Sequence, residues 1–171
     1  MASKALNQLL WDTDWGELDF LVVDLPPGTG DIHLSLVQSI PLTGAVVVST
    51  PQHIALADAK KGVNMFMMDS INVPVLGIVE NMSYFTPQEL PENKYYIFGK
   101  DGAKVLAEQL KIDFLAQIPL VQSVREASDA GRPAVLQGAT PIALDYLNMT
   151  KKILSSIKKR NANFAPTKAV E

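Results

Sequence analysis

The chain has 171 residues, of which 47% are hydrophobic and 19% are charged, and its formal net charge is −3. This composition is typical of one globular domain and not of a disordered chain, so we expect residues 1–171 to form a single domain. No apolar run reaches the roughly 20 residues of a membrane span, and residues 1–12 do not have the pattern of a signal peptide. Because cysteine is absent, disulfides, thiolate metal ligands and cysteine nucleophiles are excluded in this chain. We therefore expect a cytoplasmic protein with neither nucleic acid nor membrane as a partner.

Helical and strand patterns alternate along the chain. In order, the sequence predicts a helix over 3–11, a strand over 19–24, a helix over 32–40, a strand over 44–50, a helix over 53–69 and a strand over 73–81. Residues 83–97 read as a loop with a short strand at "YYIF". A helix over 102–110, a strand over 114–120, helices over 122–131 and 141–160, and a flexible tail over 161–171 follow. The strands are continuous apolar runs, which predicts an α/β fold: a doubly wound, mainly parallel sheet with helices on both faces.

Ligands of such sheets bind beyond the carboxyl ends of the strands, so the residues that follow each strand are the candidates. Asp24 follows the run "FLVV", as a Walker-B aspartate does when it holds Mg²⁺ beside nucleotide phosphates, often through a bound water. The alternative is a carboxylate that only caps a helix or stabilises a loop. "PPGTGD" comes next: Gly28 allows backbone N–H groups to approach an anion, while Pro27 stiffens the turn. No Walker A motif, G-x-x-x-x-G-K-[ST], occurs in the chain.

Three further residues are candidates on the same reasoning. Asp31 is placed to be the N-cap of the helix over 32–40, and that structural role is the alternative to phosphate sensing. Asn81 follows the third strand, where its amide can read the edge of a base or else close an Asx turn. Pro119, at the end of the fourth strand, can pack on a flat ring or simply end the strand.

Four segments together resemble the Mrp/ApbC-type P-loop ATPases, iron–sulfur cluster carriers related to MinD and ParA: "DFLVVDLPPGTGD", "ALADAKKGVNMF", "VPVLGIVENMSYF" and "IPLVQSVREASDAGRP". The resemblance covers about residues 3–160. It implies a P-loop ATPase fold that forms a homodimer around ATP and Mg²⁺ and passes clusters to apo-proteins. It also implies that Asp24 is the Mg²⁺ aspartate, that Gly28 and its neighbours form switch II, that Asn81 reads adenine and that Pro119 lines the base.

Two departures from the family pattern matter. The family's phosphate loop and switch I would lie upstream of Met1, so we expect the chain to be the C-terminal part of a longer ATPase and to hydrolyse nothing alone. Its strand over 20–24 would then lack one neighbour, which predicts an unstable chain or an oligomer that re-pairs this edge. Many members also carry C-P-x-C between "ENMSYF" and "IFG", where this chain has "TPQELPENKYY" with Pro87 and Leu90 near those positions. A cluster-carrier role therefore rests on the family alone.

Three other interpretations remain open. A ParA/MinD-like positioning ATPase could use the basic tail "KKILSSIKKRNANF" on an anionic surface, although that tail also fits a solvated helix end. A non-catalytic dimerisation or docking module would fit the absence of both the phosphate loop and the cysteines. A Rossmann enzyme would need a G-x-G-x-x-G near the first strand, and none is present.

Overall fold

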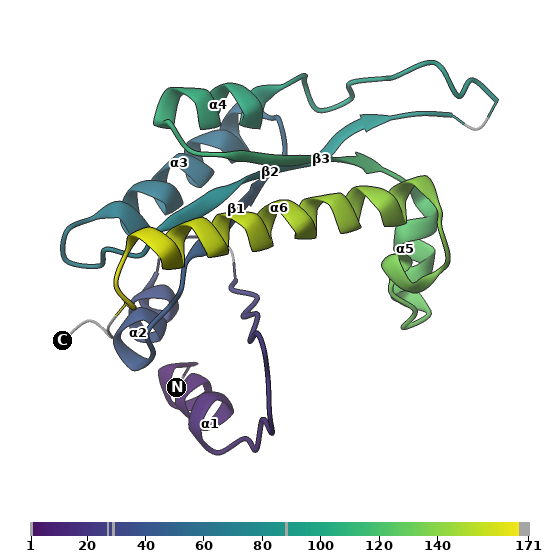
Figure 1. Cartoon of the computed structure of the whole chain (residues 1–171). Coiled ribbons are helices and arrows are strands. Elements are labelled where there is room, and N and C mark those ends of the chain that lie inside the picture. Colours follow the sequence, from purple (N-terminus) through teal and green to yellow (C-terminus); the bar gives the residue numbers. More distant parts are fainter. Residues whose placement is uncertain (1, 27, 29, 88, 168–171) are drawn as a thin grey trace.

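A three-stranded parallel sheet is the centre of the computed structural model, which describes residues 2–26, 28, 30–87 and 89–167. The strands are β1 (Ala45–Ser49), β2 (Val75–Phe85) and β3 (Phe114–Leu120), in the spatial order β1-β2-β3. Ser49 is paired with Glu80, and Asn81 with Ile118, so the carboxyl ends of the strands meet at one edge. The predicted parallel α/β sheet is confirmed (Figure 1).

Helices cover both faces of this sheet (Figure 1). On one face lie α3 (His53–Met67) and α4 (Gly102–Leu110), which bury Val63, Ala103 and Leu106 against Ile78 of β2. On the other face α6 (Pro141–Asn163) packs Ile142 against Val79, Leu115 and Ile118. Successive residues of a strand point to opposite faces, so the continuous apolar run of β2 supplies both layers. The double coverage explains why each strand of the sheet begins with a continuous apolar run.

The helix α6 begins where the sequence places it and ends later than expected. Thr140 is its N-cap, with Oγ1 accepting from the N–H of Ala143 at 3.3 Å, and Pro141 follows at the first helical position. The helix continues to Asn163, three residues into the segment 161–171 that is predicted to be a flexible tail. Thr167 Oγ1 then donates to the Leu42 carbonyl. The flexibility of the tail stays a prediction.

The predicted strand over 19–24 is wrong for this chain. These residues are coil outside the sheet, and Phe20 and Val22 are 56% and 88% exposed. Strands persist only where a neighbour accepts and donates their backbone hydrogen bonds. In the fold that the sequence resembles, the phosphate-loop strand lies beside this segment in the middle of the sheet. Among the described residues, no strand pairs with residues 19–24 or with the outer edge of β1.

The remaining elements follow the prediction with shifted ends. They are α1 (Ala2–Trp11), α2 (Asp31–Ser39) and α5 (Gln122–Asp129), whereas the 3₁₀ turn η1 (Ala134–Leu136) is an element that the sequence did not predict. The N-cap of α2 is Gly30, so the prediction that Asp31 is the cap is corrected: Asp31 is the first residue of the helix. The strand β2 extends to Phe85, which forms an isolated antiparallel bridge with Tyr95, so the start of the predicted loop belongs to β2. The short strand predicted at "YYIF" is wrong, because only Tyr95 forms a bridge and Ile97 and Phe98 lie in a turn. None of the helices in the described part of the chain has both the length and the apolarity that crossing a membrane requires.

Candidate functional site at the carboxyl end of the sheet

Two of the predicted site residues, Asn81 and Pro119, lie together at the carboxyl edge of the sheet. Asn81 is paired with Ile118, the residue before Pro119, and both Asn81 and Pro119 are half-buried. The Asn81 Oδ1 accepts the Met82 N–H at 3.0 Å, and Met82 has a left-handed φ of 53°. The described residues offer the Asn81 amide nitrogen no acceptor, so its two N–H groups stay available to a ligand. This arrangement fits an amide that reads a base while a proline packs on the ring.

A buried carboxylate holds this edge in place. Glu80 has no exposed surface; its Oε2 accepts the Ala103 N–H at 2.8 Å, and its Oε1 accepts from Gln117 Nε2 at 3.0 Å. The same Gln117 nitrogen lies 2.8 Å from Asp101 Oδ1. Glu80 therefore ties the first turn of α4 and the end of β3 to β2, and both of its oxygens have a hydrogen-bond donor inside the protein. Sequence reasoning missed this residue, although a glutamate inside the apolar run "GIVEN" was a signal.

Two hydrogen bonds, and the close packing of Gly102 against Pro51, hold the segments around Asn81 in place. Ser83, also fully buried, donates from Oγ to the Ile118 carbonyl at 3.1 Å, so β2 is attached to β3 on both sides of Asn81. A Cβ on Gly102 would lie 2.5 Å from the Pro51 carbonyl oxygen, so only glycine lets α4 start against the end of β1. Thr50, also at this end, donates from Oγ1 to Gln52 Oε1 at 2.8 Å.

The structure does not bring Asp24 to this edge. Leu25, its neighbour, packs against the buried cluster of Val37, Met65, Phe66, Ile71 and Val73, against which the first residues of β1 and β2 also pack, whereas Asn81 lies toward the carboxyl end of the sheet. Asp24 is exposed.

The other residues of that loop are placed only in part. Gly28 is exposed, with a φ of 104° that L side chains rarely adopt. Asp31 opens α2, and Pro27 lies outside the described residues. The site roles of Asp24, Pro27, Gly28 and Asp31 therefore stay predictions.

Beyond Asn81, the end of β2 leads into an arm, residues 86–87 and 89–98, that projects past the sheet (Figure 1). At its base the rings of Tyr84 and Tyr96 meet edge to face at 6.4 Å, and Lys94 Nζ lies 4.0 Å from the centre of the Tyr84 ring. Burial raises the pKa of Asp145 on α6 above its usual value, while the charge of Lys94 lowers it in part. No group of three metal-ligating side chains occurs in the described ranges. The base of the arm is therefore built from two tyrosine rings and the Lys94 ammonium.

A family model described as the ParA family, NUBPL iron-transfer P-loop NTPase, matches residues 1–154. The chain is 50% identical over 159 residues to the iron–sulfur cluster transfer protein NUBPL of Mus musculus, covering 92% of this chain and 49% of the relative. It is 46% identical over 159 residues to the iron–sulfur cluster carrier protein of Pyrococcus furiosus, covering 93% and 53% respectively. The chain thus spans about half the length of these curated relatives.

Solved structures agree with the fold. A nucleotide-binding protein from Archaeoglobus fulgidus, solved with ADP, superposes with a TM-score of 0.70 at 38% identity, over 85% of this chain and 56% of that one. The cell division ATPase MinD of Pyrococcus furiosus superposes with a TM-score of 0.62 at 21% identity, over 90% and 57%. The second likeness shows the fold alone.

Proposed function

Because the chain belongs to the ParA, or NUBPL iron-transfer P-loop NTPase, family, we propose that it supplies the base-binding and Mg²⁺-sensing part of an ATP-dependent iron–sulfur cluster carrier. The observation that carries the proposal is the pairing of Asn81 with the Ile118–Pro119 end of β3 at the carboxyl edge, in a chain 50% identical to a cluster transfer protein. ATP is the nucleotide proposed, and a homodimer the assembly.

In this proposal each candidate residue has one role. The Asn81 amide donates to the adenine edge, and Pro119 packs on the ring. Asp24 holds Mg²⁺ through a bound water, and Pro27, Gly28 and Asp31 form the loop that responds to the γ-phosphate. Bound Mg²⁺ would supply charge neutralisation between phosphates. Since Asp24 lies away from Asn81 here, the Mg²⁺ role requires residues 19–31 to move to the carboxyl edge, where a neighbouring strand would order them.

The iron–sulfur cluster is the cargo, and this chain does not hold the usual ligands for it. All 171 residues lack cysteine, and clusters are bound mainly by cysteine thiolates. Thiolates for a transferred cluster must come from another segment or another protein, such as the receiving apo-protein. The proposed location is the cytoplasm.

Calorimetric titration with ATP and Mg²⁺ tests the proposal on two proteins: this chain, and a fusion that places the matching N-terminal half of the Pyrococcus furiosus carrier ahead of it. We expect the fusion to bind ATP and this chain to bind at least about a hundredfold more weakly, because a P-loop lysine and its backbone cradle supply much of the phosphate affinity. Asn81→Ala in the fusion should reduce the preference for ATP over GTP. Equal, tight binding by both proteins, or none by the fusion, would contradict the proposal.

A positioning ATPase like MinD is the weaker candidate. The MinD likeness is at 21% identity and shows the fold alone, whereas the relatives near 50% are named for cluster transfer. A docking module without catalysis is the expected result if the fusion fails to bind nucleotide but still dimerises.

A further inference from the structure

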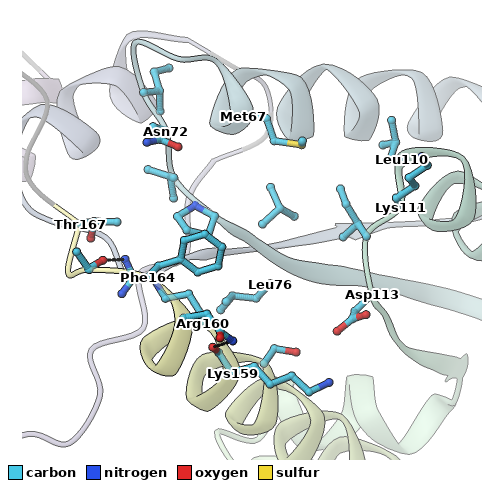
Figure 2. Close-up of a pocket in the computed structure, with 18 of the residues that line it drawn as sticks. Met67, Asn72, Leu76, Leu110, Lys111, Asp113, Lys159, Arg160, Phe164 and Thr167 are labelled. Atoms are coloured by element: carbon cyan, nitrogen blue, oxygen red, sulfur yellow. Dashed lines mark hydrogen bonds between the residues drawn. The ribbon is translucent and has the colours of Figure 1, made fainter.

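A cavity of about 940 Å³ lies at the amino end of the sheet, away from the edge that carries Asn81. Its walls are the connection from α3 to β2, the connection from α4 to β3, and the last turns of α6 with the strap 164–167 (Figure 2). The volume is in the range of small-molecule sites, about 300–1,000 Å³. This end of the sheet plays no part in the function proposed above.

The charge of Arg160 is the unusual feature of this cavity. Its side chain is 8% exposed, and in Figure 2 it lies at the end of α6, across the cavity from Met67 and Asn72, whereas the Lys159 side chain extends away from it. Nη1 donates to Asn161 Oδ1 at 3.0 Å and Nη2 to the Ala165 carbonyl at 2.7 Å, while Nε is buried with no partner in the described part of the chain. No carboxylate of the described residues forms an ion pair with Arg160. The guanidinium stays charged at any ordinary pH.

A purely structural role explains only part of this arrangement. The two bonds made by Nη1 and Nη2 hold the strap after α6, as a basic side chain near a helix C-terminus often does. Among the described residues, three of the five N–H donors have no hydrogen-bond acceptor and the positive charge has no anion beside it. A buried charge is unfavourable unless it is paired and hydrogen-bonded, so the site is more stable with an anion present.

The other lining residues define the kind of anion. Three cations, Lys111, Lys159 and Arg160, line the cavity against two carboxylates, Asp69 and Asp113, which leaves one excess positive charge. The rest of the wall is more apolar than polar: its large apolar side chains are Met67, Ile71, Leu76, Leu110, Ile112 and Phe164, beside the polar Ser70, Asn72, Ser156, Asn163 and Thr167. An excess of one charge beside an apolar wall suits a molecule with one negative group and a hydrocarbon body.

We propose that this cavity binds a small monocarboxylate with an apolar body, whose carboxylate pairs with Arg160 and Lys159 while its hydrocarbon part packs on Leu76 and Phe164. The guanidinium fork matches carboxylate geometry, and Lys159 at the exposed rim adds a second charge.

Titration of the 171-residue chain with octanoate, and separately with octan-1-ol, tests the role of the charge without any substitution. We expect octanoate to bind at least about tenfold tighter than octan-1-ol, because only the carboxylate pairs with Arg160. NMR shift changes should concentrate at residues 110–113 and 164–167 and spare Asn81. Equal affinity for the two probes, no octanoate binding, or shifts elsewhere would overturn the proposal and leave Arg160 as a strap-holding residue only.

Three variants show which basic side chain pairs with the carboxylate of octanoate. Arg160→Gln should weaken octanoate binding at least about tenfold, and Lys159→Gln about threefold. Lys152→Gln, which removes the same charge from an exposed position of α6 outside the cavity wall, should leave binding unchanged. If Arg160→Gln does not fold, the exposed Lys159→Gln still decides, since unchanged octanoate affinity in that variant contradicts the proposed pair.

Discussion

Segments 19–31 and 75–85 carry the two most specific sequence signals, but only segment 75–85 forms a strand of the sheet. Segment 75–85 lies between β1 and β3, and its polar residues are bonded to both β3 and α4. Segment 19–31 has equally apolar residues before its polar turn, yet residues 19–24 are coil and Val22 is 88% exposed. The difference teaches that an apolar run becomes a strand only where neighbours complete its ladder.

The largest expected effect is in backbone amide hydrogen exchange. Amides of Ile78, Val79 and Glu80 should exchange at least about a thousandfold more slowly than those of residues 20–24, because core strands open only with large-scale unfolding. Mass spectrometry or NMR on the 171-residue chain measures both segments together. In the fusion with the N-terminal half of the Pyrococcus furiosus carrier, residues 20–24 should become protected. Comparable protection of both segments in the chain alone would break the comparison.

The second effect concerns the buried carboxylate. Glu80→Ala should lower the free energy of unfolding by about 2–4 kcal/mol, because the Ala103 N–H and Gln117 Nε2 lose their acceptor inside the protein. Urea unfolding followed by circular dichroism gives the value. Glu92→Gln, at an exposed turn, is the control and should change it by less than about 0.5 kcal/mol. Similar losses in both variants would show that Glu80 does not anchor the edge.

The third effect concerns packing between β2 and β3. A Cβ at Gly77 would lie 2.4 Å from Leu115 Cγ and 2.7 Å from the Asp113 carbonyl oxygen, so Gly77→Ala should destabilise the chain by about 2 kcal/mol. Gly62→Ala is the matched control: it lies within α3 with nothing within 4 Å of the new Cβ, and it should stabilise by about 0.5–1 kcal/mol. Thermal unfolding of the two variants should give opposite shifts in Tm, and shifts of the same sign would refute this account of the strand pair.

The smallest effect is a pH dependence at the base of the arm. Burial raises the pKa of Asp145 in the folded chain, so the folded state holds that proton more tightly than the unfolded state does. Ionised Asp145 therefore lowers the free energy of unfolding. This loss of stability is complete above the pKa that Asp145 has in the folded chain, and it disappears at pH values below its ordinary pKa of 3.8. Asp145→Asn should therefore stabilise at pH 7, by no more than about 0.5 kcal/mol because Asp145 is only partly buried, and the gain should fade as the pH falls.

Lys94→Gln is the matched control for this last prediction. Removing the ammonium takes away the charge that lowers the pKa of Asp145, so the penalty at pH 7 should grow and the variant should be less stable. Urea unfolding at several pH values measures the free energy of unfolding of Asp145→Asn and of Lys94→Gln. A gain from Asp145→Asn that is constant with pH would show that the carboxyl does not titrate as described.

The sequence by itself determined the strands β1, β2 and β3, their parallel arrangement and the placement of Asn81 and Pro119 at one edge. These follow from local patterns, since apolar β-branched runs alternate with helical ones and each connection is a crossover. The family resemblance, carried by "DLPPGTGD" and "GIVENMSYF", is likewise present in the sequence and agrees with the matched family model.

Only the tertiary structure decided what depends on neighbours distant in the sequence. Residues 19–24 are coil although their local pattern favours a strand, because none of the described strands pairs with them. The role of Glu80 depends on Ala103 and Gln117, 23 and 37 residues away, and the buried charge of Arg160 appears only once α6 packs beside the amino ends of β2 and β3. Burial and pairing are properties of the assembled chain, which a one-dimensional pattern does not contain.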